Sequence, residues 1–222
     1  MNTQKLDSVK VWDPVVRMGH WTLVGSFFIA YFSEDDFLSL HVWAGYVLGI
    51  VVLFRILWGL IGTKHARFGD FLCSPAKTIT YLKSLRKGTA KHYLGHNPAG
   101  GVMIILLLLM LSATTYTGLQ LYAIEENAGP IAALRKISIN ENSAQLVSAA
   151  YADSEKNEEN LKHGSGVNEE AEEFWEELHE WFTNLTLMLI FLHVSGVFIS
   201  SYLHKENLIK AMVTGKKIKG RI

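Results

Sequence analysis

The segment at positions 38–61, LSLHVWAGYVLGIVVLFRILWGLI, decides the fold, because Arg55 is the only formally charged side chain along it. A helix of roughly 20 apolar residues is long enough to cross the hydrocarbon core of a bilayer. A segment of this length and composition therefore predicts a transmembrane helix. The whole chain has the same bias, since 49% of its 222 residues are hydrophobic.

Three further segments are apolar enough to cross a bilayer, at positions 15–33, 99–122 and 174–203. The first is the least apolar of the four, because Arg17 and His20 lie within it. The residues before it are polar and no small-residue cleavage site follows it, so we expect this segment to remain as a membrane anchor. The sequence therefore predicts an all-α integral membrane protein, a four-helix bundle that forms one domain over residues 1–222.

The distribution of basic side chains predicts how the bundle is oriented. The connection between the second and third helices carries Lys64, Arg67, Lys77, Lys83, Arg86, Lys87 and Lys91. The stretch after the fourth helix is basic as well, whereas the first connection carries Glu34, Asp35 and Asp36. Lys and Arg accumulate in the cytoplasmic loops of membrane proteins. We therefore expect a multi-pass protein of the cell's inner (plasma) membrane with both termini in the cytoplasm.

A long acidic connection at positions 123–173 separates the third and fourth helices and is expected on the outer side. Its beginning, from position 129, could form a short helix. The stretch ADSEKNEENLKHGSGVNEEAEE at positions 152–173 has the composition of a solvated or disordered segment. Two roles stay open for this outer loop, a flexible acidic connection and a docking site for an external protein partner.

Four histidines lie inside the expected helices: His20, His41, His179 and His193. An ionisable side chain within the hydrocarbon is costly and marks a functional site by default, although a single one can be a neutral histidine bonded to a neighbouring helix. Here the depths match in pairs, since His20 lies near the cytoplasmic end of its helix and His41 near the outer end. His193 follows His179 by 14 residues, which is about 21 Å of helix rise and nearly four turns. The fourth helix therefore offers one imidazole near each membrane surface, on one face.

Two stacked pairs of histidines suit haem better than zinc. Catalytic zinc usually takes three protein ligands, often with carboxylate or cysteine among them, whereas two imidazoles from different helices suit the axial positions of a haem iron. We therefore predict two b-type haems, an inner one held by His20 and His193 and an outer one held by His41 and His179. Such haems pass electrons, because two nitrogen ligands leave no open position for oxygen chemistry. The single cysteine, Cys73, excludes the CxxCH signature of covalently bound c-type haem.

Arg55 follows His41 by 14 residues and is therefore expected at the depth of the inner pair. An arginine there needs an anionic partner. A haem propionate is our candidate, with Arg17 as a second contact, and the alternative is an arginine that reaches the cytoplasmic headgroups. Small residues that would admit a flat cofactor, or simply allow close helix packing, are Gly19, Gly25, Ala44, Gly45, Ser195 and Gly196.

His96, Asn97 and Pro98 come directly before the main part of the third helix. Proline suits the first turn of a helix, and Asn97 before it can act as the N-cap. A role beside the inner haem or a quinone is the alternative for this group of residues.

Four stretches carry a resemblance to a known family: VWDPVVRMGHW, HVWAGYVLGIVVLFRILWGLIGTKHARFGDF, GHNPAGGVMIILLLLMLSATTYTG and LHEWFTNLTLMLIFLHVSGVFISSYLHKENLIKAMVTGKK. In this order they resemble the bacterial cytochrome b561 family, which includes the b-type cytochrome subunits of membrane-bound nickel–iron hydrogenases. The resemblance covers nearly the whole chain except the outer loop. It implies a four-helix bundle with two haems b, axial ligands at His20, His41, His179 and His193, and electron exchange with a membrane quinone and a redox partner. The long acidic outer loop departs from the more compact members, so the partner's identity stays open.

The leading expectation is transmembrane electron transfer between the quinone pool and an outer-side redox protein of hydrogenase or cytochrome c type. Membrane lipid surrounds such a protein, and no nucleic-acid partner and no catalytic side chain are expected. One alternative is a stand-alone quinone reductase that takes electrons from a small outer reductant such as superoxide. The other is a membrane anchor that binds haem without carrying electrons.

Overall fold

The computed structural model describes residues 8–34, 37–93, 95–147 and 160–218, and the chain divides into two compact units. Unit 1 comprises Met1–Ser112 and Leu185–Ile222, and unit 2 comprises Ala113–Asn184. The boundaries fall within two long helices, so each unit contains part of α5 (Pro98–Glu125) and part of α7 (Asn160–His204).

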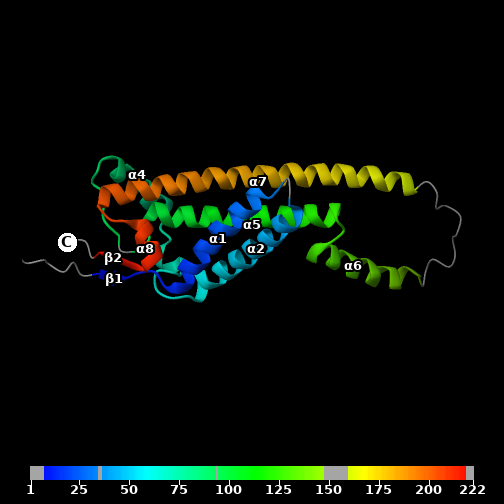
Figure 1. The fold of residues 1–222 in the computed structure, drawn as a ribbon, viewed down its shortest axis with the longest axis horizontal. Coiled ribbons are helices and arrows are strands. Elements are labelled where there is room, and N and C mark those ends of the chain that lie inside the picture. Colours follow the sequence, from blue (N-terminus) through cyan, green and yellow to red (C-terminus); the bar gives the residue numbers. More distant parts are fainter. Residues whose placement is uncertain (1–7, 35–36, 94, 148–159, 219–222) are drawn as a thin grey trace, which may run out of the picture. The chain divides into compact units, whose positions relative to one another are not determined.

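Unit 1 is built on α1 (Pro14–Phe32) and α2 (Leu38–Ile61), which lie side by side (Figure 1). Buried apolar side chains from these two helices and from the first part of α5 form its core: Phe27, Leu48, Val52, Leu108 and Leu111. In a membrane, the lipid hydrocarbon outside a helix bundle is as apolar as the core inside it. Such a core therefore holds the helices together through close packing rather than through escape from water.

Among the described residues, three helices are long and apolar enough to cross a membrane: Leu38–Ile61, Pro98–Glu125 and Glu169–His204. Large apolar side chains such as Leu57 and Phe191 are exposed along them, which suits lipid and would be unusual over a whole soluble monomer. The predicted all-α membrane fold is therefore confirmed. Helix α1 forms where a span was predicted but is not one of these three helices, so the fourth span stays a prediction.

Side chains cap the first turns of two helices. The Asp13 carboxylate accepts a hydrogen bond from the backbone N–H of Val16 at 2.8 Å, and Pro14 occupies the first turn of α1. At the start of α5, Asn97 Oδ1 accepts from the backbone N–H of Gly100 at 2.7 Å. The predicted N-cap role of Asn97 is therefore confirmed.

The connection predicted as a loop at 123–173 is helical over most of its described part. Helix α5 continues to Glu125, α6 spans Gly129–Val147, and α7 begins at Asn160. Good helix formers explain the difference, since Ala and Leu recur in α6 beside Arg135 and Lys136, and Glu recurs in the start of α7. An acidic composition alone does not separate a solvated helix from a disordered segment. Positions 148–159 lie outside the described residues, so the expected disorder is not tested there.

The first and last described segments of the chain meet in unit 1. Strand β1 (Ser8–Lys10) pairs antiparallel with β2 (Lys216–Ile218), and the short helix α8 (Leu208–Thr214) precedes β2. Gly215 joins α8 to β2 with a φ of +79°, a left-handed conformation that glycine adopts without strain. Its carbonyl accepts the backbone N–H of Val11 at 2.9 Å. The first and last described segments are therefore held together at one end of unit 1.

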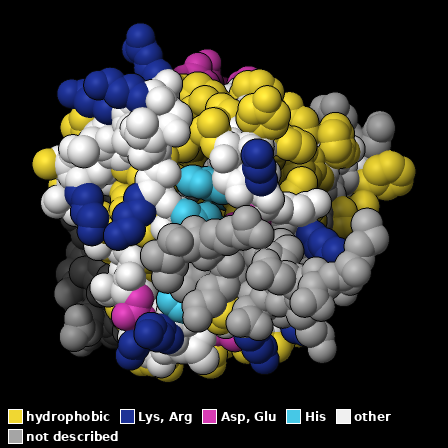
Figure 2. Space-filling view, turned by 90° about the vertical axis from the view of Figure 1, so that its left-hand side faces the viewer, with side chains coloured by type: hydrophobic (Ala, Val, Ile, Leu, Met, Phe, Trp, Pro, Cys, Tyr) yellow, Lys and Arg dark blue, Asp and Glu magenta, His cyan; other side chains and the backbone are white. Residues whose placement is uncertain are grey.

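The connection after α2 adds the short helix α3 (Phe68–Phe71) and the helix α4 (Pro75–Arg86) to this end of unit 1. Figure 2 shows Lys and Arg side chains spread over the end that carries α4 and α8, with histidine side chains between them. Below this basic surface, the buried carboxylate of Glu206 pairs with Lys217 at 3.7 Å and with His92 at 3.1 Å. These contacts tie the connection before α5 to the last strand.

Candidate functional site

His20 on α1 and His193 on α7 lie close together within unit 1. Their ring centroids are 6.4 Å apart, and the ring planes are inclined at 57°. An imidazole centroid lies roughly 3 Å from a metal bound by its nitrogen, since that bond is about 2 Å long, so two rings on opposite sides of one metal have centroids about 6 Å apart. The observed distance therefore fits a metal held between the two rings. The predicted inner pair is brought together, and its role as iron ligands stays a prediction.

Within the part of the chain that the structure describes, no group of three or more His, Cys, Asp or Glu side chains could hold a metal ion. A zinc site with several protein ligands is therefore not found there. Two imidazoles alone suit a cofactor that brings the remaining ligands itself. A haem does so, because its macrocycle occupies the equatorial positions and leaves the two axial ones to the protein.

His41, near the start of α2, lies against the backbone of α1. Its Nδ1 is 3.0 Å from the carbonyl oxygen of Ala30, and this contact assigns the ring proton to Nδ1 as the donor. A metal-binding histidine is commonly oriented in this way, with one ring nitrogen bonded to a carbonyl while the other binds the metal.

His179 on α7 has the same kind of contact within unit 2. Its Nδ1 lies 3.0 Å from the carbonyl oxygen of Thr114 and 3.0 Å from Thr117 Oγ1. Gly118 lies against the same ring, since a Cβ at this position would come within 2.9 Å of His179 Cε1. Helix α5 therefore presents a surface on which this imidazole fits only while residue 118 is glycine.

His41 belongs to unit 1 and His179 to unit 2, so their pairing as outer ligands stays a prediction. Sequence reasoning missed the residues of α5 that contact His179. A signal for them exists, because the stretch ATTYTG at positions 113–118 brings hydroxyl groups and a glycine into an otherwise leucine-rich helix.

The two arginines predicted to contact a haem propionate each keep a buried donor without a hydrogen-bond partner. For Arg55 this donor is Nη1, and its guanidinium lies 5.4 Å from the ring centroid of Phe68. For Arg17 it is Nε, while Nη1 donates to the Val213 carbonyl at 2.6 Å. Arg17 therefore holds α8 to α1, a structural role that the sequence did not predict. A buried donor without a partner is rare in proteins and calls for a ligand or an ordered water.

His96 lies just before α5 and is packed between other elements of unit 1. Its ring centroid is 4.4 Å from that of Trp12 and 4.5 Å from that of Phe71. Burial lowers the pKa of His96 to about 3, and the positive charge of Arg55 contributes to the shift. The imidazole is therefore neutral at physiological pH, and its Nδ1 is buried without a hydrogen-bond partner.

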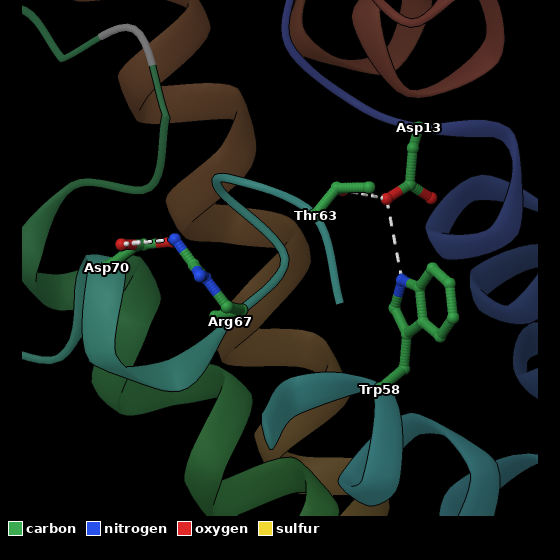
Figure 3. Close-up of polar contacts among 5 residues, drawn as sticks. All are labelled: Asp13, Trp58, Thr63, Arg67 and Asp70. Carbon is green, nitrogen blue, oxygen red and sulfur yellow. Dashed lines mark hydrogen bonds and ion pairs between the residues drawn. The ribbon is translucent and has the colours of Figure 1, made fainter. Parts of the chain in front are cut away.

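Asp13 fixes the start of α1 to the end of α2. Besides capping α1, its carboxylate accepts hydrogen bonds from Trp58 Nε1 at 3.5 Å and from the hydroxyl of Thr63 (Figure 3). Burial raises the pKa of Asp13, but these hydrogen bonds and that from Val16 lower it below its usual value. The carboxylate is therefore charged at neutral pH, and it holds together the two helices at the end of α1 that carries His20.

A helical membrane fold in which two histidines lie close together is the arrangement expected of a membrane cytochrome b, and comparison with known proteins gives the class. The chain belongs to the prokaryotic cytochrome b561 family, which matches residues 11–215. It is similar to the probable Ni/Fe-hydrogenase B-type cytochrome subunits of Azotobacter vinelandii and Azotobacter chroococcum mcd 1, each 27% identical over 150 residues. Each alignment covers 54% of this chain and 62% of the relative, so the chain spans less than two thirds of those proteins' length. No solved structure matches.

Proposed function

We propose that this chain carries electrons across the plasma membrane through two b-type haems, between the membrane quinone pool and a redox protein on the outer side. The observation that carries the proposal is the 6.4 Å between the rings of His20 and His193, in a chain that belongs to a cytochrome b family. Haem b bound there supplies reversible one-electron chemistry at an iron that has no open coordination position.

At the inner site, His20 would bind the iron from α1 and His193 from α7. Both side chains are half-buried, and an apolar surrounding of this kind limits access of water to a metal site. Arg55 and Arg17 each have a buried N–H donor, and Arg55 is expected at the depth of the inner pair. A guanidinium matches the geometry of a carboxylate such as a propionate.

At the outer site, His41 and His179 would be the ligands. Their pairing rests on their matched depths in the sequence, since each lies near the outer end of its predicted span, 38–61 for His41 and 174–203 for His179. The Nδ1 contacts of both residues support it, because the contacts orient the two imidazoles in the way that metal ligands are oriented.

The orientation that we propose has the basic end of unit 1, with both termini, in the cytoplasm. The partner that we propose is a hydrogenase or a c-type cytochrome, because the two relatives are named as subunits of Ni/Fe-hydrogenases.

A redox titration of the optical spectrum of the purified full-length protein, with a haem count per chain, tests this function. We expect two haems, each with a bis-histidine spectrum. The substitutions His20→Ala and His193→Ala should remove or shift the same component, and His41→Ala and His179→Ala should affect the other. His204→Ala, a histidine at the end of α7, serves as the control and should keep both. A single haem per chain, or loss of one and the same component in His20→Ala and His41→Ala, would contradict the proposal.

A further inference from the structure

Two polar groups at the cytoplasmic end of unit 1 are buried without partners, Nη1 of Arg55 and Nδ1 of His96. They come from different elements, since Arg55 lies on α2 and His96 directly before α5. A buried polar group that makes no hydrogen bond costs about 1–3 kcal/mol, and more when it is charged. Two aromatic rings connect them: the Arg55 guanidinium lies 5.4 Å from the ring centroid of Phe68, which packs against Phe71 at 5.9 Å, and Phe71 lies 4.5 Å from His96. Two unpartnered groups in one such cluster point to one ligand that satisfies both.

The surroundings of His96 indicate what charge that ligand carries. Besides burial, the pKa of His96 is lowered by Arg55, then by Lys217, His65 and His193. Each of these is a cation or a histidine, and no carboxylate is among the described groups that shift this pKa. Lys217 already pairs with the carboxylate of Glu206 at 3.7 Å, whereas the guanidinium of Arg55 keeps a buried N–H donor without a partner. The group that remains to be satisfied is therefore positively charged and favours an anion.

His193 is itself one of these neighbours, so the unpartnered groups lie beside the proposed inner haem site. We infer that Arg55 and His96 together bind a propionate of the inner haem, with the imidazole N–H and the guanidinium each donating to the carboxylate. This inference rests on the proposed function and adds His96 to the residues that hold the cofactor.

A quinone carbonyl is a weaker candidate for the same position. It could accept a hydrogen bond from His96, but it is neutral and would add no negative charge beside the guanidinium of Arg55, on which the charge of Asp13 also acts. A carboxylate satisfies the donor of His96 and the charge of Arg55 at once.

The packing around His96 holds its ring in one orientation before a ligand binds. Trp12 and Phe71 contact the imidazole, and the adjacent Gly95 lies so close to His65 that a Cβ at 95 would come within 2.9 Å of His65 Nδ1. A donor that is already oriented loses little entropy when it binds.

The test compares haem b with its dimethyl ester, in which both propionates are blocked. Full-length protein in a His179→Ala background, so that only the inner site is expected to remain, is made in cells deficient in haem synthesis and loaded with either cofactor. Haem loss is measured by transfer to excess apomyoglobin, with His96 intact, with His96→Leu, and with His96→Gln, which keeps an N–H donor. We expect His96→Leu to lose haem b about tenfold faster, the factor for one hydrogen bond to a charged group. The ester should leave the protein with His96 intact and the His96→Leu variant at the same rate. With haem b, His96→Gln should retain the cofactor better than His96→Leu.

Equal acceleration of both cofactors by His96→Leu would overturn the inference, because it would mean that His96 only supports the packing. An unchanged rate with haem b would overturn it as well. If His96→Leu does not fold, His96→Phe, which keeps a flat ring between Trp12 and Phe71 but has no N–H donor, replaces it and is judged on the same criterion, a difference between haem b and its ester. Absence of any bis-histidine spectrum from the loaded parent protein would instead overturn the proposed function, and this inference with it.

Discussion

His41 and His179 show how an imidazole inside a membrane helix is oriented by backbone atoms of another helix. Each has Nδ1 3.0 Å from a carbonyl oxygen, that of Ala30 on α1 and that of Thr114 on α5. A helical carbonyl can accept this second hydrogen bond because its oxygen has two lone pairs. The ring proton is then fixed on Nδ1, so the metal bond that we propose would be made by Nε2. These contacts depend on the register between neighbouring helices, and a single sequence does not contain that register.

Gly118→Ala should disturb the outer haem and leave the inner one intact. The added Cβ would lie 2.9 Å from Cε1 and 3.3 Å from Nδ1 of His179, so the ring must shift away from its contacts on α5. Changes in the residues that orient a metal ligand commonly lower metal affinity by 10–100-fold, and we expect a loss of at least about tenfold at the outer site. Haem titration and the redox spectrum measure it. Gly69→Ala is the control, because a Cβ there meets nothing within 4 Å. An unchanged outer component in Gly118→Ala would mean that His179 is not a ligand.

At the scale of the helices, the pairing of β1 with β2 constrains how often the chain crosses the membrane. The two strands lie near opposite ends of the sequence and are hydrogen-bonded to each other, so both lie on one side of the bilayer. The part of the chain between β1 and β2 therefore crosses the bilayer an even number of times. Three helices, α2, α5 and α7, have the length and apolarity of spans among the described residues. Helix α1, with 19 residues, is therefore the expected fourth span, although Arg17 and His20 make it less apolar.

Reporter fusions test this four-span topology. Fusions after Arg86 and after Gly220 should report the cytoplasm, and a fusion after Asn160 should report the outer side. The physical reason is the retention of Lys and Arg in cytoplasmic connections. A fusion after Asp36 separates the models most sharply, because it lies on the outer side only if α1 crosses the membrane. A cytoplasmic signal at that position would show that α1 lies along the membrane instead of spanning it.

Most helices of this bundle could be predicted because their signals are local. The span 38–61 was predicted at the bounds of α2, from its length and apolarity alone, and Asn97 was predicted as the cap of α5 from residue type and position. Helix α6 was expected only as a short element at the start of a loop, because solvated helices and loops share a polar composition. The inner pair of histidines was predicted from depth and periodicity, and its centroid distance agrees. The contacts of Gly118 and His96 were not predicted, since they arise only when separate helices pack.

At the scale of the whole molecule, the chain has no net charge but separates its charges along the sequence. Basic residues lie in the connections that we assign to the cytoplasm. Acidic residues gather at the start of α7, where the exposed ones are Glu169, Glu170, Glu173, Glu176 and Glu177. Since the charges sum to zero, an approaching protein is attracted or repelled according to the side on which it arrives. The acidic side would attract a redox partner with a basic surface, and charges of this kind raise association rates.

Replacing Glu169, Glu170 and Glu173 by glutamine should therefore slow electron exchange with a positively charged c-type cytochrome, used as the probe. We expect a decrease of about tenfold at low ionic strength. The difference should shrink as salt is added, because exposed charges are screened over about 8 Å at physiological ionic strength. Stopped-flow mixing of the reduced membrane protein with the oxidised probe measures the rate, and the haem spectrum should stay unchanged. Lys77→Gln with Lys83→Gln on α4 is the matched control, since these residues are expected on the cytoplasmic side, away from the partner. A rate independent of both the glutamates and salt would mean that the acidic residues only keep the outer segment solvated, and that the partner docks on another surface.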